Sequence, residues 1–320
     1  MNLEPERVIT SPARTARRLR RAAPVLALVV AATSAAATTA VAQTGGTASG
    51  RAGGTLGATV GRTVGGTAAD PVPLAGCPSP GRVKPTVVLV HGAWADASSW
   101  NGEVRSLQRA GYAVRAVANP LRDLTSDAET VADFLKTVSG PIVLVGHSYG
   151  GSVITNAAAG VPNVKALVYV DAAAPDVGET NGQLSGSDSD LNGDPATLYD
   201  KVPYPGAPAG AADLYLKRKV FVRSFASDLP RRTAVRLWAT QRAASTSAFT
   251  TPSKAAAWKT IPSWFFISTG DRIITPSSQR AMARRAGSKV TEFKGGSHLT
   301  LISHPEAVTS VIGSAVCSVR

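Results

Sequence analysis

Short apolar runs alternate with amphipathic helical segments over most of the sequence, and this alternation restricts the fold more than any other feature. The run TVVLV at 86–90 is rich in β-branched residues and predicts a buried strand, with a helix following over 98–111. The strongest helix signal lies at Ser126, which stands with Glu129 at the spacing of a capping box. Further strands are predicted at 113–118, 141–145, 165–170, 263–268 and 289–293, and a last helix from about Pro305. We therefore expect an α/β fold with a mostly parallel sheet covered by helices on both faces.

One block, from Pro175 to about Ile261, interrupts the alternation because it has no clear strand pattern. It opens with a loop rich in Gly, Ser and Asp at 178–195, and helix-like stretches follow. These stretches carry the aromatic residues Tyr215, Phe221, Phe225, Trp238 and Phe249. A loop this long is usually functional or forms a small cap. We predict an insertion at about 175–261 over the sheet, whose aromatic residues either pack the cap or line a pocket for an apolar acyl or aryl group.

The first 42 residues have the layout of an export signal. A basic run precedes an apolar stretch at 22–37, and a small-x-small motif ends at Ala42. The basic run contains Arg14, Arg17, Arg18, Arg20 and Arg21. This order predicts a secretory signal peptide at 1–42 and a secreted, extracellular protein, by either the general secretory or the twin-arginine route. A transmembrane anchor is the alternative, but Thr33 and Ser34 interrupt the apolar run, which is short of the about 20 residues that a span needs.

A segment poor in core-forming residues follows at 43–76. It consists mostly of Gly, Thr and Ala and contains no aromatic residue, so we predict a flexible linker. The rest of the 320-residue chain, 77–320, is then one folded domain.

Charge and cysteine content exclude several classes of function. The net charge is +13, of which 1–42 contributes +4, and the remaining basic residues are scattered without interleaved aromatic residues. A nucleic-acid platform would need that interleaving, so no nucleic-acid partner is expected. The two cysteines cannot form a four-thiolate zinc site, and no His, Cys or Asp cluster has ligand spacing, so no metal or cofactor is expected.

The most specific motif is Gly-His-Ser-Tyr-Gly at 146–150. It directly follows the predicted strand at 141–145 and precedes GSVITNAAA, which has a helical pattern. A Gly-x-Ser-x-Gly motif between strand and helix is typical of a nucleophile elbow, where a sharp turn exposes the serine. A dinucleotide-binding loop is excluded, because the spacing does not match Gly-x-Gly-x-x-Gly and the motif follows the third strand. We predict Ser148 as a nucleophile.

A serine nucleophile needs a base, and the chain has four histidines. His298 is the predicted base, since the loop after strand 289–293 lets it reach back over the sheet edge. His147 lies inside the elbow and His91 ends the first strand, so both are expected to be structural. His304 precedes Pro305 and is expected to cap a helix.

The base needs a carboxylate to fix its tautomer. Asp271 follows strand 263–268 and is the predicted acid, because the next strand leads to His298. Asp171, which follows strand 165–170, is the alternative. The loop His-Gly-Ala-Trp at 91–94 follows the first strand, so we predict that Ala93 N–H and Tyr149 N–H form an oxyanion hole and that Trp94 lines the substrate site.

Together these residues resemble the α/β-hydrolase superfamily over 84–320, in which the triad occurs in the order Ser148, Asp271, His298. VVLVHGAWADASSW and VLVGHSYGG are similar to the branch that contains plant methylesterases, hydroxynitrile lyases and small bacterial esterases. The resemblance implies a sheet of about eight strands with a helical cap after the sixth, whereas the strand pattern supplies only six or seven.

The resemblance implies a serine hydrolase that cleaves small-molecule carboxylic esters through an acyl-enzyme. Hydroxynitrile lyases of this branch carry a lysine directly after the catalytic histidine, where this chain has Leu299. Dehalogenases of the superfamily use an aspartate in place of Ser148. Hydrolysis of amides, lactones or carbon–carbon bonds, perhydrolysis, and a non-catalytic binding role on the same scaffold stay open.

The two cysteines lie at the ends of the predicted domain. In an exported protein, a Cys77–Cys317 disulfide would tie the last helix to the entry of the domain. Closing so long a loop stabilises by roughly 4–5 kcal/mol in the chain-entropy model. Two unpaired buried thiols are the alternative.

Overall fold

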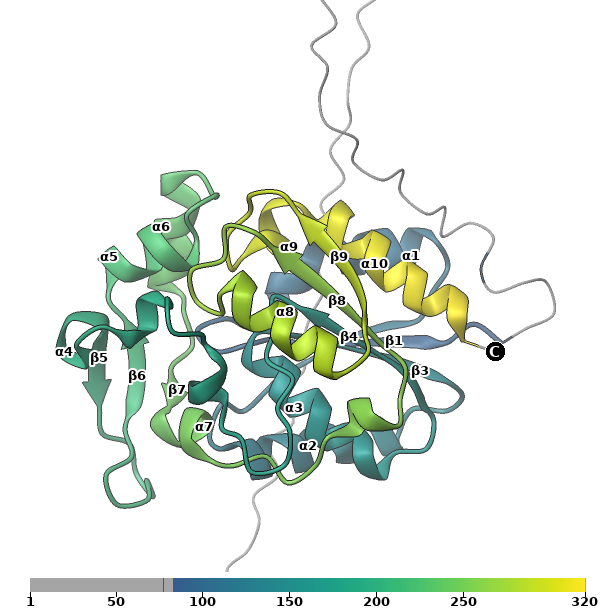
Figure 1. The fold of residues 1–320 in the computed structure, drawn as a ribbon, viewed down its shortest axis with the longest axis horizontal. Coiled ribbons are helices and arrows are strands. Elements are labelled where there is room, and N and C mark those ends of the chain that lie inside the picture. The colour runs from purple at the N-terminus through teal and green to yellow at the C-terminus, as the bar shows by residue number, and fades with distance from the viewer. Residues whose placement is uncertain (1–76, 78–82, 320) are drawn as a thin grey trace, which may run out of the picture. The chain divides into compact units, whose positions relative to one another are not determined.

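The computed structural model describes residue 77 and residues 83–319, which form a layered α/β fold. Its central sheet has six parallel strands in the order β2-β1-β3-β4-β8-β9 (Figure 1). The strands are β1 (Thr86–Val90), β2 (Val114–Val117), β3 (Ile142–His147), β4 (Val164–Val170), β8 (Ser263–Ser268) and β9 (Lys289–Phe293). The predicted parallel sheet is confirmed, although the described residues contain six strands where the resemblance implies about eight. The predicted signal peptide at 1–42 and linker at 43–76 lie outside the described residues.

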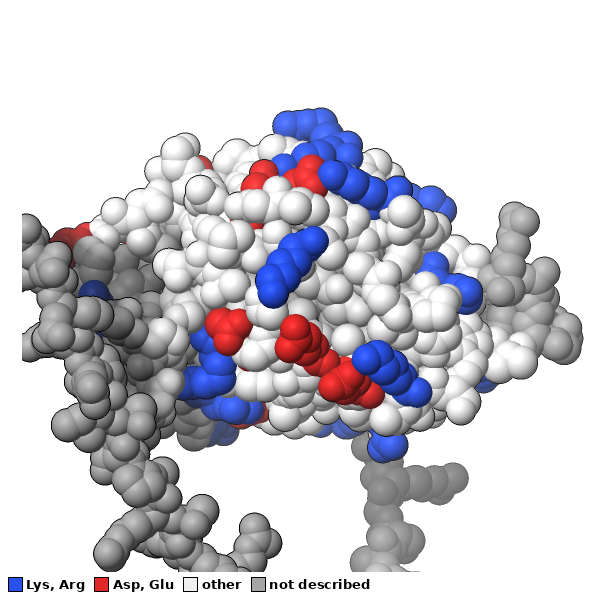
Figure 2. Space-filling view, turned by 90° about the horizontal axis from the view of Figure 1, so that it is seen from below, with Lys and Arg blue, Asp and Glu red and all other residues white. Residues whose placement is uncertain are grey.

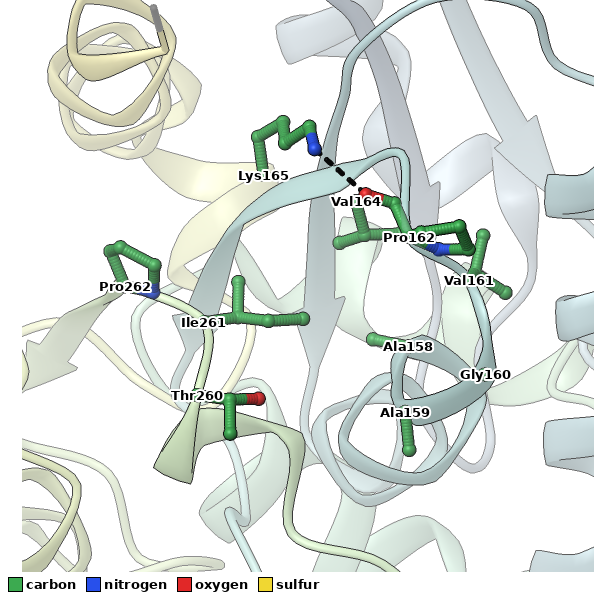
Figure 3. Close-up of a pocket in the computed structure, with 10 residues that line it drawn as sticks. All are labelled: Ala158, Ala159, Gly160, Val161, Pro162, Val164, Lys165, Thr260, Ile261 and Pro262. Atoms are coloured by element: carbon green, nitrogen blue, oxygen red, sulfur yellow. Dashed lines mark hydrogen bonds between the residues drawn. The ribbon is translucent and has the colours of Figure 1, made fainter.

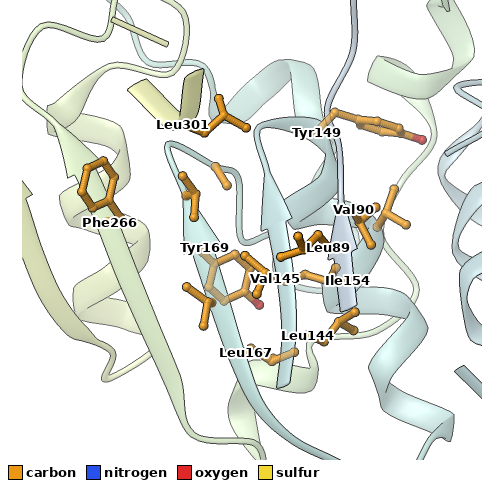
Figure 4. Packing of buried hydrophobic residues seen from close by; sticks show 14 of the residues in the cluster. Leu89, Val90, Leu144, Val145, Tyr149, Ile154, Leu167, Tyr169, Phe266 and Leu301 are labelled. Atoms are coloured by element: carbon orange, nitrogen blue, oxygen red, sulfur yellow. The ribbon is translucent and has the colours of Figure 1, made fainter. Parts of the chain in front are cut away.

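The middle strands form the core of the fold. Every residue of β3 is buried, and apolar side chains from neighbouring strands pack beside one another (Figure 4). Those labelled in Figure 4 include Leu89, Leu144, Val145, Leu167 and Tyr169. Strands covered on both faces are apolar in both side-chain rows, which explains their continuous apolar sequences. The result is a rigid sheet, and the loops carrying the predicted site residues leave its carboxyl edge.

Helices cover both sides of this sheet (Figure 1). On one side α1 (Asn101–Arg109) packs against α10 (Pro305–Ser318), and on the other α2 (Leu124–Lys136) packs against α3 (Tyr149–Ala157). The remaining helices outside the insertion are α8 (Pro276–Arg285), α9 (Thr300–Ser303) and the 3₁₀ helices Ala97–Trp100 and Ala158–Gly160. Of the helices in the described ranges, none combines the length and the apolar character that a membrane span requires.

The start of α2 differs from the prediction. The helix begins at Leu124, and Asp123 caps it by accepting hydrogen bonds from the N–H groups of Thr125 and Ser126, both at 3.0 Å. The capping box predicted at Ser126 and Glu129 is therefore wrong. Asp123 is a stronger cap because its short carboxylate accepts from two free N–H groups and its charge favours a helix N-terminus.

The insertion lies between β4 and β8, beside the sheet in Figure 1. It contains a three-stranded antiparallel sheet of β5 (Tyr199–Val202), β6 (Asp213–Leu216) and β7 (Ala244–Ser245). Its helices are α4 (Pro195–Leu198), α5 (Arg218–Val220), α6 (Arg231–Ala239), α7 (Thr246–Thr250), a π-helical turn (Phe221–Phe225), and 3₁₀ turns at Asn181–Leu184, Asp190–Asn192 and Ala257–Lys259. The prediction of an insertion without strands is wrong in this respect. Strands of only two to four residues are too short to produce a recognisable strand pattern in the sequence.

A disulfide joins Cys77 to Cys317, as predicted. The two residues are 240 positions apart, and Cys317 lies in the last turn of α10. The bond thus ties the start of the described domain to its last helix.

Charged side chains are dispersed on the surface drawn in Figure 2. Lys and Arg form separate groups on this face, and Asp and Glu lie between some of them. Several arginines of the described fold form ion pairs, such as Arg280 with Glu292 and Arg285 with Glu179. The face in Figure 2 therefore carries no continuous basic groove.

Candidate active site

Ser148 lies at the sharp turn between β3 and α3. Its backbone has φ 55° and ψ −125°, which an L-residue rarely adopts. The turn is tightly packed, since a Cβ on Gly146 would lie 2.5 Å from Gly150 O, and a Cβ on Gly150 would lie 2.4 Å from Val90 O. Both positions therefore require glycine, and the strained turn holds the Ser148 side chain at the carboxyl edge of the sheet.

Three side chains from three loops form one hydrogen-bonded line at this edge. Ser148 Oγ lies 2.7 Å from His298 Nε2, and His298 Nδ1 lies 2.8 Å from Asp271 Oδ2. The loop after β8 supplies Asp271, and the loop after β9 supplies His298. All three residues are buried, and Ser148 is 4% exposed. The structure thus brings together the three residues predicted as nucleophile, base and acid.

Asp171, the alternative acid, has different partners. Its carboxylate accepts hydrogen bonds from the N–H (2.6 Å) and the hydroxyl (2.8 Å) of Ser268. By contrast, Asp271 Oδ2 binds His298 and also accepts a hydrogen bond from the Gln279 side-chain amide at 2.9 Å. No sequence pattern points to Gln279, because a glutamine on α8 that turns back to a preceding loop belongs to no motif.

Burial shifts the pKa values of His298 and Asp271. It lowers the pKa of His298 to about 3, so the imidazole is neutral at neutral pH and can accept a proton. Burial also raises the pKa of Asp271, while two backbone N–H groups and the Gln279 amide favour its charged form. When His298 Nδ1–H donates to Asp271, the lone pair of Nε2 faces the Ser148 hydroxyl.

The other histidines have supporting contacts. His147 Nε2–H donates to the carbonyl of His298 at 2.8 Å, so the elbow histidine holds the backbone of the predicted base. His91 Nδ1–H donates to Gly92 O, and its Nε2 accepts from Asn119 N–H. His304 occupies the N-cap position of α10, as predicted, although its side chain makes no capping hydrogen bond. Within the described residues no three His, Cys, Asp or Glu side chains are placed to hold a metal ion.

The loop after β1 passes directly against the serine. A Cβ on Gly92 would lie 2.5 Å from the Cβ of Ser148, so the next residue, Ala93, is also close to the elbow. Neither Ala93 N–H nor Tyr149 N–H has a hydrogen-bond acceptor among the described residues. Tyr149 is the first residue of α3, where N–H groups lack intrahelical partners and can bind an anion.

Sequence comparison decides the family of this fold and site. The model of the Alpha/beta hydrolase family matches residues 87–311. The chain belongs to the alpha/beta hydrolase family. This hydrolase is 33% identical over 106 residues to the carbendazim hydrolyzing esterase of Nocardioides sp. (strain SG-4G), a match that covers 29% of this chain and 44% of the esterase.

Two further matches cover nearly all of the other protein. Alpha/beta hydrolase nvfD of Aspergillus novofumigatus (strain IBT 16806) is 28% identical over 270 residues, which is 73% of this chain and 97% of nvfD. The crystal structure of polyneuridine aldehyde esterase superposes with a TM-score of 0.61 at 19% identity, covering 72% of this hydrolase and 98% of that chain. At this identity the superposition supports the fold alone.

Aromatic rings from the insertion surround Trp94 of this hydrolase. The Trp94 ring lies 5.9 Å from Tyr199, 5.8 Å from Phe225 and 5.3 Å from Phe249. Its indole N–H donates to Leu214 O on β6 at 2.9 Å, and its backbone has a positive φ of 57°. The residue that follows Ala93 is thus held by the insertion. Tyr199 and Phe249 also line a cavity of about 190 Å³ that contains no charged side chain.

A larger cavity, of about 510 Å³, lies away from this site (Figure 3). It is lined by Ala158, Ala159, Gly160, Val161, Pro162, Val164, Lys165, Thr260, Ile261 and Pro262. Val164 and Pro262 stand at the beginnings of β4 and β8, whereas Ser148 follows the end of β3, so the cavity lies at the opposite edge of the sheet. Lys165, the second residue of β4, donates from Nζ to Pro162 O at 2.8 Å. The cavity is therefore remote from Ser148 and lined mostly by apolar residues.

Proposed function

We propose that this hydrolase cleaves small-molecule carboxylic esters through an acyl-enzyme on Ser148. The observation that carries the proposal is the line from Ser148 Oγ through the His298 ring to Asp271, with contacts of 2.7 and 2.8 Å. The names of two similar proteins, a carbendazim hydrolyzing esterase and polyneuridine aldehyde esterase, support esters as substrates.

The proposed mechanism follows from these positions. His298 takes the Ser148 proton as the serine oxygen attacks the acyl carbon, and Asp271 stabilises the resulting imidazolium. Ala93 N–H and Tyr149 N–H bind the oxyanion, each worth about 3–4 kcal/mol in the transition state. His298 then protonates the departing alcohol, and a water activated by the same histidine releases the acid.

We also propose that the protein is exported. The basic, apolar and small-residue layout of 1–42 supports this proposal. The Cys77–Cys317 disulfide supports it independently, because such bonds persist in oxidising compartments.

Hydrolysis of p-nitrophenyl esters from acetate to palmitate tests the ester proposal. Ser148→Ala is expected to lower kcat by about 10⁴-fold or more, because the nucleophile is lost. Ser152→Ala is the matched control, since this buried serine of the same helix donates to Asn181 Oδ1 rather than to His298. Labelling of Ser148 by a fluorophosphonate gives a second readout.

Each outcome of this experiment has a distinct meaning. Undiminished hydrolysis by Ser148→Ala would show that another group is the nucleophile. A labelled Ser148 without hydrolysis of any ester would leave a reactive serine and redirect the search to amides, lactones or carbon–carbon bonds. A wild-type protein that neither reacts with the probe nor hydrolyses esters would favour a binding role.

A further inference from the structure

One segment of the insertion contacts the loop that carries His298. The carboxylate of Asp228 accepts hydrogen bonds from the hydroxyl of Ser297 and, at 2.5 Å, from the hydroxyl of Ser303. Asp228 lies between the π-helical turn and α6, so it is some 70 residues before its partners in the sequence. This contact crosses from the insertion to the main domain.

The two serines flank the base. Ser297 directly precedes His298, and Ser303 ends α9, the short helix that follows it. Ser297 is fully buried, and its Oγ also accepts from Leu299 N–H at 3.1 Å. Asp228 therefore holds the turn around His298 from both sides.

The same segment also touches the imidazole itself. The Phe225 ring lies 5.1 Å from the His298 ring and 5.8 Å from the Trp94 ring. Phe225 ends the π-helical turn, a conformation that is rare and occurs mostly at functional sites. The Phe225 ring and the Asp228 carboxylate thus both hold this segment of the insertion against the loop that carries His298.

We propose that Asp228 is a positioning residue for His298, an inference that rests on the proposed function of the triad. Among the described residues its carboxylate forms no hydrogen bond with the Ser148, His298 or Asp271 side chains, so it acts through the loop. With both hydroxyls bound, the loop keeps Nε2 at hydrogen-bond distance from Ser148 Oγ. Displacement of a catalytic group by about 1 Å can lower the rate by about 100-fold.

The test measures kcat per active site titrated with fluorophosphonate, together with KM for p-nitrophenyl acetate. Asp228→Ala is expected to lower kcat per labelled site by about 10- to 100-fold with KM within about twofold. Asp228→Asn keeps one carbonyl oxygen as an acceptor, so it should recover part of the rate. Ser303→Ala removes one of the two donors and should have a smaller effect.

Asp200→Asn is the matched control, because Asp200 pairs with Lys217 at 2.5 Å inside the insertion. It should behave as wild type. A purely structural role for Asp228 would reduce the number of labelled sites while leaving kcat per site unchanged, and that result would overturn the proposal. If Asp228→Ala does not fold, kcat per labelled site is compared in the same way for Asp228→Asn and Ser303→Ala, and an unchanged value in both would overturn the proposal.

The proton resonance of His298 Nδ1–H, bound to Asp271, provides a readout without catalysis. The proposal expects this resonance to shift or broaden in Asp228→Ala and to stay at its wild-type position in Asp200→Asn. An unchanged resonance in Asp228→Ala would contradict it. This resonance tests the positioning of His298 even if the wild-type protein hydrolyses no ester. Failure of the ester proposal and failure of the positioning proposal are therefore separate results.

Discussion

At the scale of single residues, Glu103 is a buried carboxyl group without a hydrogen-bond partner among the described residues. It lies in the first turn of α1 with no exposed surface, and neither carboxylate oxygen has a hydrogen-bond partner in the described residues. Burial raises its pKa well above the ordinary value, and the nearby Glu306 adds to the rise. The folded protein therefore retains a proton that the unfolded chain loses above about pH 4.5.

This difference makes stability depend on pH at Glu103. Since the folded state binds more protons, the free energy of unfolding falls as the pH rises from about 4.5 towards the folded pKa. Glu103→Gln removes the titrating group, so its stability relative to wild type should improve between pH 5 and pH 8. The gain is about 1.4 kcal/mol for each unit of pKa shift spanned. Urea unfolding at both pH values measures it, with exposed Glu129→Gln as the control, and an equal difference at both values would contradict the argument.

At the scale of elements, the nucleophile depends on how closely α3 approaches β1. Gly150→Ala would place a Cβ 2.4 Å from Val90 O and 2.9 Å from His91 O, which are backbone atoms that cannot turn aside. We expect α3 to shift, with a stability loss of about 1–3 kcal/mol and a loss of ester hydrolysis as Tyr149 N–H moves. Gly160→Ala is the control, because nothing lies within 4 Å of its Cβ. Thermal unfolding and kcat together test this, and a fully active Gly150→Ala would show that the helix can yield.

The same scale explains what the sequence could predict. The strands at 86–90 and 263–268 were predictable to the residue, since apolar runs followed by loops carry their own signal. The mostly exposed strand at 289–293 also has the predicted bounds. Ser148 and His298 were identifiable because each stands in a local context of strand, loop and helix. Asp228 was not, because its partners are distant in the sequence and no motif links them. The strands of the insertion were missed because strands of only two to four residues are too short to show a strand pattern.

At the scale of the whole molecule, the insertion contacts both halves of the proposed site. On the oxyanion side, Trp94 donates to Leu214 O on β6, and on the base side Asp228 accepts from Ser297 and Ser303. The insertion is therefore part of the framework that holds Ala93 and His298, and its folding and the geometry of the site are linked.

The Cys77–Cys317 disulfide acts on the same scale, and neither of its residues belongs to the triad. Because it closes a loop spanning 240 positions, replacing both cysteines by serine should lower the free energy of unfolding by up to about 5 kcal/mol. Hydrolysis by the variant at 25 °C should stay within about twofold of wild type, since neither cysteine contacts Ser148, Asp271 or His298. In denaturant unfolding, the variant and the reduced wild-type protein should have the same midpoint. Equal midpoints for oxidised wild type and the variant would mean that the ends of the domain stay together without the bond.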